Sequence, residues 1–158
     1  MAFRDQDQRA VFEGEDPAGE GHPIYNVAMA VGSQYAPNVW DDVLLVQFFL
    51  KKIYEHPESP YVSPEGGSMK VDGLCGPKTK AWIRHFQTAG KFNNRKGWVD
   101  GRIDRSQGSG VATIQKAIYW ISFLNNDFAV LYGLQVYDNL WMIPDMPPAL
   151  NGALSRTV

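Results

Sequence analysis

A run of apolar residues near the centre of the chain constrains the fold more than any other feature. One set recurs at spacings of four and three residues, as on one face of a helix: Val39, Val43, Val46, Leu50 and Ile53. Others widen this face to almost the whole circumference: Trp40, Leu44, Leu45, Phe48 and Phe49. The helix should begin with Asn38 as its N-cap and end before Pro57. A helix that is apolar on nearly all sides must be covered on several of them, by the terminal segments or by a partner.

Two further helices are predicted after this one. The second should occupy residues 77–89, because Pro77 suits a first helical turn and Gly90 suits a helix end. Its buried face would carry Trp82, Ile83 and Phe86. The third should occupy about residues 109–125, with an apolar face formed by Ile114, Ala117, Ile118, Ile121 and Leu124.

The two ends of the chain have a different composition. Residues 1–23 are rich in Gly, Asp, Glu and Pro and are predicted to form an extended arm. The short apolar run over residues 24–31 could be a strand or a helical turn. The organisation predicted is therefore an N-terminal arm over residues 1–37 with one short apolar segment, a helical domain over residues 38–126, and an aromatic, Pro-containing extended tail over residues 127–158.

Two Val-Asp-Gly tripeptides stand before the second and third predicted helices. They are Val71-Asp72-Gly73 and Val99-Asp100-Gly101. An Asp side chain can accept a hydrogen bond from the backbone two residues later, and Gly tolerates positive φ. Each tripeptide therefore predicts a tight turn.

The order of helices and turns resembles the three-helix peptidoglycan-binding domain family of cell-wall hydrolases. The family pattern for the first helix is matched at Val43, Val46, Gln47 and Leu50. The pattern for the first turn and second helix is matched by a longer set: Val71, Asp72, Gly73, Gly76, Thr79, Ile83, Phe86 and Gln87. Asp100 and Gly101 match its second turn, whereas Trp82 and Asp104 depart from the small residue and the Gly of the family. The resemblance covers about residues 39–125 and implies a mainly α protein, a compact three-helix core with extended N- and C-terminal arms.

The resemblance implies a bacterial, non-catalytic module that binds peptidoglycan or a muropeptide. Such a ligand needs a shallow groove in which sugar faces stack on Trp or Tyr and carboxylates pair with Arg or Lys. The candidates for this groove are Trp98, Arg102, Arg84, Lys78 and Tyr61. Most signature residues are instead predicted to be structural: Asp72 and Asp100 form turns, Gln47 and Gln87 bond to loop backbone, and Phe86 lies in the core.

The sequence offers little support for an enzyme. His22, His56 and His85 are the only histidines, and Cys75 is the single cysteine, so neither a zinc-peptidase motif nor a thiolate cluster is present. No cofactor or metal is expected. A lysozyme-like alternative would rest on Glu13 and Asp16, and it would leave too few residues for a hydrolase fold.

The rival hypothesis is a structural adaptor of a phage or contractile injection particle. It rests on the excess apolar surface of the first helix and on the aromatic termini, which would serve protein partners or self-association. The chain has neither a run typical of a signal peptide nor one long enough for membrane insertion, so we expect synthesis in the cytoplasm and action at a cell wall, in a virion or in a secretion particle. Residues 70–105 carry nine basic and three acidic side chains, and this region is interpreted as a solvated surface rather than a nucleic-acid site.

Overall fold

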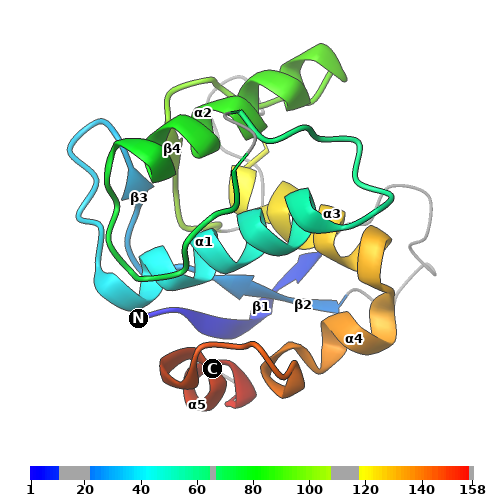
Figure 1. Ribbon diagram of the computed structural model, residues 1–158. Coiled ribbons are helices and arrows are strands. Elements are labelled where there is room, and N and C mark those ends of the chain that lie inside the picture. The colour runs from blue at the N-terminus through cyan, green and yellow to red at the C-terminus, as the bar shows by residue number, and fades with distance from the viewer. Residues whose placement is uncertain (11–21, 65–66, 108–117, 157–158) are drawn as a thin grey trace.

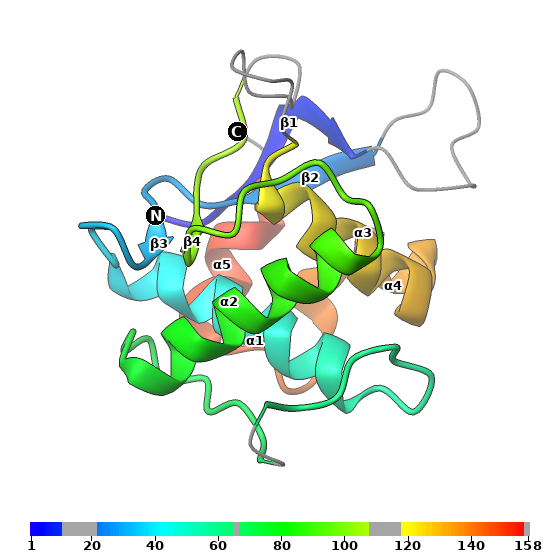
Figure 2. The ribbon, with the colours of Figure 1, turned by 90° about the horizontal axis from the view of Figure 1, so that it is seen from above.

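Helix α1 (Trp40–Glu55) lies at the centre of the computed structural model, which describes residues 1–10, 22–64, 67–107 and 118–156. Every residue from 42 to 50 is buried, so no face of this stretch is open to solvent. Helices α2 (Pro77–Phe92), α3 (Trp120–Tyr132) and α5 (Pro148–Ser155) pack on different sides of α1 (Figure 1, Figure 2). Apart from Val39 and Trp40 at its start, which are exposed, the apolar surface predicted for the first helix is therefore covered by the chain itself, including its C-terminal segment.

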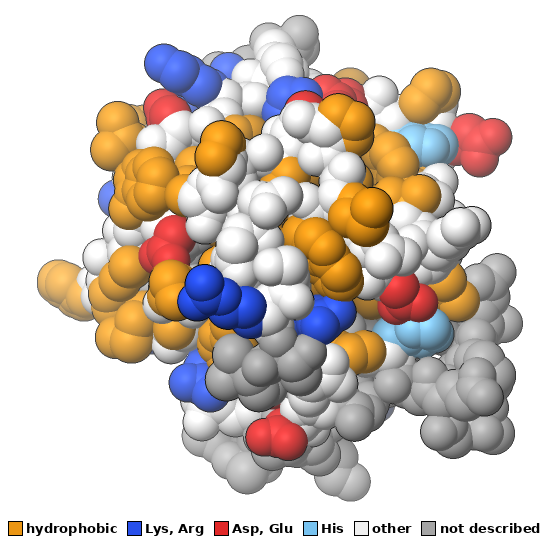
Figure 3. All heavy atoms as spheres, turned by 90° about the horizontal axis from the view of Figure 1, so that it is seen from below, with side chains coloured by type: hydrophobic (Ala, Val, Ile, Leu, Met, Phe, Trp, Pro, Cys, Tyr) orange, Lys and Arg blue, Asp and Glu red, His pale blue; other side chains and the backbone are white. Residues whose placement is uncertain are grey.

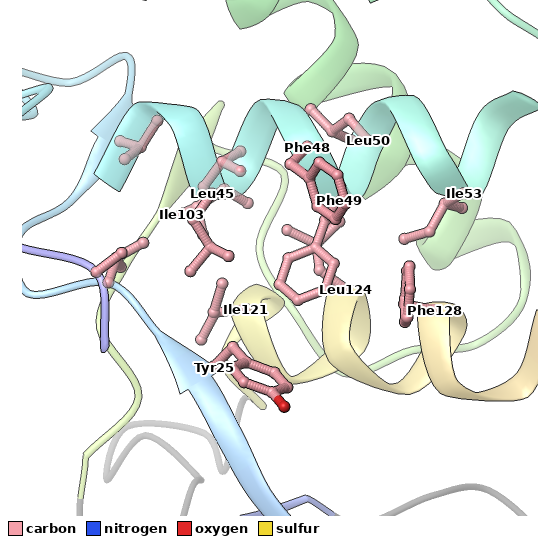
Figure 4. Packing of buried hydrophobic residues seen from close by; sticks show 14 of the residues in the cluster. Tyr25, Leu45, Phe48, Phe49, Leu50, Ile53, Ile103, Ile121, Leu124 and Phe128 are labelled. Carbon is pink, nitrogen blue, oxygen red and sulfur yellow. The ribbon is translucent and has the colours of Figure 1, made fainter. Parts of the chain in front are cut away.

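The main core lies between α1 and α3. Figure 4 shows Leu45, Phe49 and Ile53 on α1 facing Ile121, Leu124 and Phe128 on α3. The Phe49 and Phe128 rings meet edge to face, with their centroids 5.7 Å apart. The described residues form five α-helices and four short strands, so the predicted mainly α class is confirmed. Among these helices, none is both long and apolar enough to cross a bilayer.

The described part of the N-terminal segment, predicted as an extended arm, forms a pair of antiparallel strands that pack on α3 and α5. Strand β1 (Phe3–Ala10) pairs with β2 (His22–Asn26), with Phe3 opposite Asn26. Side-chain bonds tie β2 to α3, because Asn125 Oδ1 accepts a hydrogen bond from the Tyr25 backbone N–H at 2.8 Å. The first part of the run over residues 24–31 is thus a strand. Glu13 and Asp16 lie outside the described residues.

A second, shorter sheet brings the chain before α1 to the second Val-Asp-Gly turn. Strand β3 (Val31–Gly32) pairs with β4 (Arg102–Ile103), with Gly32 opposite Arg102. The Ser33 backbone N–H also donates to Gly101 O at 2.9 Å. This pairing fixes the loop between β3 and α1 against the turn.

Two predicted helix boundaries are wrong. Asn38 is not the N-cap of α1, since Val39 holds that position and the Asn38 side chain accepts a hydrogen bond from the Gly32 N–H at 2.7 Å. Gly90 does not end α2, which continues to Phe92. The Trp120 ring packs so closely on Gly90 that a Cβ there would lie 2.6 Å from it. Gly90 therefore makes room for an indole instead of terminating the helix.

The third helix lies later in the chain than predicted. Its first residue is Trp120, after Tyr119 in extended backbone, and it continues to Tyr132 rather than ending at Asn125. Ile118 precedes the helix. Ile114 and Ala117, which were expected on its apolar face, lie outside the described residues.

The prediction of an extended C-terminal arm is wrong. The chain forms α4 (Leu134–Asp138), the 3-10 helix η1 (Leu140–Met142) and α5, and the side chains of Leu150 and Leu154 are fully buried. Pro148 begins α5, where the missing N–H leaves no hydrogen bond unmade. These helices close the lower side of the molecule, and Figure 3 shows hydrophobic side chains in separate groups over that face.

Candidate binding site at the second turn

The two Val-Asp-Gly turns are each held by a buried glutamine from a neighbouring helix. At the first turn, Gln47 Oε1 accepts the N–H groups of Asp72 at 3.0 Å and Gly73 at 2.8 Å. Its Nε2 donates to Leu74 O and to Thr79 Oγ1, both at 3.0 Å. The shape of the turn is therefore set by a side chain from α1 as well as by its own residues.

Gln87 of α2 makes the same kind of contact at the second turn. Its Oε1 accepts the Gly101 N–H at 2.8 Å, and its Nε2 donates to Asp100 Oδ1 at 3.1 Å and Arg102 O at 2.9 Å. The Asp100 carboxylate in turn accepts the Arg102 N–H at 3.0 Å. Gly101 has a φ of +74°, which any other residue would adopt only with strain.

The first turn has the same internal hydrogen bond, and in addition its glycine lies against the Trp40 ring. Asp72 Oδ1 accepts the Leu74 N–H at 3.0 Å, and this bond lowers the pKa of the Asp72 carboxyl below its ordinary value. Gly73 has a φ of +77°, and a Cβ there would lie 2.2 Å from the Trp40 ring. Gly76 and Thr79 follow at the start of α2, where Thr79 is buried, and Phe86 lies fully in the core further along that helix.

Trp98 and Arg102 line one hollow beside the second turn. Its volume is about 70 Å³, and the other residues that line it are Asp100, Asp104, Ile118, Tyr119 and Trp120. The Trp98 indole is 44% exposed, and the Trp98 carbonyl accepts a hydrogen bond from Trp120 Nε1 at 2.8 Å. Arg102 Nε pairs with Asp104 Oδ1 at 2.7 Å. A partly exposed indole and a partly exposed ion pair thus line the same hollow.

None of the other three predicted groove residues, Arg84, Lys78 and Tyr61, lines this hollow. Arg84 is exposed on α2, with Nη2 3.6 Å from the position that a Cβ on Gly101 would take. Lys78 lies at the first turn, where its Nζ donates to Ser68 O at 2.8 Å and it lines a separate hollow of about 300 Å³. The single groove predicted from the sequence is therefore divided between the two turns.

Tyr61 is inside the protein, so its prediction as a surface contact is wrong. Its hydroxyl donates to Asp127 Oδ2 and accepts a hydrogen bond from Arg95 Nη1 at 3.2 Å. Arg95 and Asp127 form a largely buried ion pair, with Nη1 to Oδ2 at 2.9 Å. Burial raises the pKa of the Tyr61 hydroxyl, and the adjacent Asp127 carboxylate raises it further.

Tyr119 and Trp120 belong to the hollow but were not among the predicted groove residues. Trp120 was expected within a helix, and nothing local indicates that its ring would pack against Gly90 and Gly97. The contact joins segments more than twenty residues apart, so only the folded chain reveals it. Within the described ranges, no group of three or more His, Cys, Asp or Glu side chains is placed to hold a metal ion.

The hollow is small, so it can contact part of a larger ligand but cannot enclose a whole one. A flat indole can carry the apolar face of a ring, and Arg102 and Asp104 can exchange hydrogen bonds with hydroxyl or amide groups. No model of a protein family, no curated protein and no solved structure matches this chain. The contacts described here are therefore the basis for assigning a role.

Proposed function

We propose that the chain is a non-catalytic module that binds peptidoglycan or a related cell-wall glycan at the hollow beside the second turn. In this proposal α1, α2 and α3 correspond to the three helices of the peptidoglycan-binding domain family. The observation that carries it is the half-exposed Trp98 indole next to the Arg102–Asp104 ion pair. Sugar rings are recognised by such a pairing of an aromatic face with a few polar groups.

The size of the hollow supports a binding module over an enzyme. Small-molecule sites usually measure roughly 300–1,000 Å³ and surround most of the ligand. The hollow of about 70 Å³ can take a substituent such as an acetamido group, while the ring that bears it lies on the surface. A glycan that carries such a substituent on a ring lying at the surface fits this shape.

The ion pair in the hollow contributes little to the fold. Both side chains are partly exposed, at 31% for Arg102 and 41% for Asp104, and exposed pairs of this kind are worth at most about 1 kcal/mol. Asp104 can therefore turn toward a ligand at small cost. Arg102 also donates from Nη1 to Gln34 O at 2.8 Å, which holds the guanidinium in position.

Co-sedimentation with purified sacculi tests this function. The wild-type chain should sediment with sacculi at moderate salt, and the double substitution Trp98→Ala with Arg102→Ala should weaken binding about tenfold or more, because it removes both anchors. Phe92→Ala is the matched control, since this ring is also exposed but lies at the end of α2, outside the hollow. A wild-type chain that stays in solution would refute the proposal, and undiminished binding by the double variant would place the ligand elsewhere.

A structural adaptor is the second candidate function, and exposed apolar side chains at the first turn favour it. Trp40 is 52% exposed and Leu74 is 68% exposed, and the Trp40 indole donates from Nε1 to Asp72 O at 3.1 Å. Two results together would favour the adaptor. The wild-type chain would not bind sacculi, and light scattering would show a multimer that the double substitution Trp40→Ser with Leu74→Ser dissociates. Within α1 this exposed apolar surface is confined to Trp40 at its start, because residues 42–50 are buried by the rest of the chain.

A further inference from the structure

We propose that Tyr35 is a second aromatic contact of the glycan site, carrying a neighbouring sugar of the strand that lies on Trp98. The inference rests on the proposed function and adds a residue from outside the region that resembles the binding-domain family. Tyr35 lies in the loop between β3 and α1, which projects from the molecule next to β4 (Figure 1, Figure 2). Its side chain is completely exposed, at 103% of the reference area.

The backbone at this position is unfavourable for a tyrosine. Gln34 and Tyr35 have φ values of 57° and 58°, and the Ala36 N–H donates to Ser33 O at 3.2 Å to close the turn. A turn with positive φ at both central residues strongly favours Gly and Asn, because a Cβ in this conformation meets the following carbonyl oxygen. The sequence places two large side chains where the turn itself prefers none.

The surrounding contacts hold the loop in this conformation. Ser33 N–H is bonded to Gly101 O, and Asn38 Nδ2 donates to Gly32 O at 3.0 Å and to Ala36 O at 3.2 Å. These bonds involve backbone and the Asn38 amide, and the Tyr35 ring takes no part in them. Strained residues that persist in this way occur mainly at functional sites. The fold therefore maintains a strained backbone at a residue whose ring adds no packing.

The loop and the hollow are joined by one side chain. Arg102 lines the hollow, pairs with Asp104 and donates to Gln34 O, the residue before Tyr35. Arg102 thus connects the hollow that Trp98 also lines to the backbone of the turn that carries Tyr35. Tyrosine offers a large contact area with few rotatable bonds, so its ring loses little entropy on binding. Two such rings suit a strand of linked sugars better than a single small molecule.

Tyr35→Gly distinguishes a binding role of the ring from a structural one. If the ring binds glycan, the melting temperature and the binding should change in opposite directions; if it is structural, both should fall. The variant should raise the melting temperature by relieving the positive φ, and it should weaken co-sedimentation with sacculi several-fold by removing the ring. Gln34→Gly is the matched control, since it relieves the same kind of strain next to the ring and should raise the melting temperature with binding unchanged. Tyr35→Phe should keep binding, because the ring face is retained.

Each other outcome is decisive. Wild-type binding that Tyr35→Gly leaves intact would overturn this inference while the proposed function stands. A fall in both melting temperature and binding, with the same fall in Gln34→Gly, would show that the loop conformation rather than the ring matters. If the wild-type chain does not bind sacculi, the inference and the proposed function fail together. Loss of a multimer in Tyr35→Gly in that case would assign the ring to a protein contact.

Discussion

Two buried amides define the loop geometry of this protein. Gln47 and Gln87 come from different helices, yet each accepts a hydrogen bond from a turn glycine and donates one to the preceding aspartate and one to the carbonyl that follows the glycine. Both side chains are almost fully buried. A buried amide with all its hydrogen bonds made specifies its partners closely, because every alternative leaves a polar group unpaired.

Replacing Gln47 by Leu should lower the free energy of unfolding by about 2 kcal/mol or more. The substitution leaves the Asp72 and Gly73 N–H groups and Thr79 Oγ1 without their present partner, and each such buried group costs about 1–3 kcal/mol. Urea denaturation measures the change. Gln135→Leu, on an exposed side chain, is the control and should change stability by less than about 0.5 kcal/mol. A comparably small loss in Gln47→Leu would mean that water takes over the hydrogen bonds of the amide.

At the residue scale, the sequence predicted the positions of side chains that lie beside the same turn. It did not predict the position of Tyr61, whose partners are distant in the sequence. Trp98 and Arg102 could be associated because both flank the same turn, whose chemistry is encoded in Asp100 and Gly101. Tyr61 could not be placed, because its burial depends on the Arg95–Asp127 pair, and Asp127 is 66 residues away. Tyr35 gave no signal in the sequence, since only a positive φ makes an exposed tyrosine informative.

At the scale of helices and strands, periodicity located α1 and α2 and was overridden elsewhere. Gly90 has the character of a helix end, yet α2 continues through it, and the absence of a side chain at Gly90 leaves the space that the Trp120 ring occupies. The polar strand β1 lacks the alternation of a half-buried strand and is formed through its pairing with β2. The prolines of the C-terminal segment led to the wrong prediction of an extended tail, since Pro148 begins α5 instead of preventing a helix.

The helix α5 should be essential to stability, in contrast to a dispensable arm. Leu154 is fully buried on α5, which packs against β1 and α1. Leu154→Ala should therefore lower the free energy of unfolding by about 2–5 kcal/mol, through lost burial and the cavity left behind. Met142→Ala, an exposed apolar residue of the same segment, should cost far less in the same urea titration. Equal effects of the two substitutions would show that the segment does not dock as described.

For the whole molecule, buried tyrosines should determine how stability responds to alkaline pH. Burial raises the pKa of the Tyr25, Tyr54, Tyr61 and Tyr137 hydroxyls above the usual value of about 10. The folded state therefore favours the neutral phenol, and this contribution to stability is complete below pH of about 10 and is lost as pH rises further. We expect most tyrosines to ionise together with unfolding, as followed by tyrosinate absorbance and circular dichroism.

A Tyr25→Phe variant gives this prediction a quantitative control. One fewer proton is released on unfolding, so the decline of stability above pH of about 10 should become shallower by about 1.4 kcal/mol per pH unit. In the wild-type protein, ionisation of the buried tyrosines while the circular dichroism stays native would contradict this account. It would mean that water reaches buried hydroxyls such as that of Tyr25, which donates to Tyr137 O at 2.6 Å.

The enclosure of α1 has a consequence for amide hydrogen exchange. Residues 42–50 are surrounded by α2, α3, α5 and β3, so we expect their N–H groups to reach solvent only when the molecule opens globally. Such a helix cannot move toward a partner without the rest of the protein coming apart. Ligands can therefore be recognised only by the segments that surround α1. Exchange of the α1 amides should report the free energy of global unfolding, and a bound ligand should raise that value by its own free energy of binding.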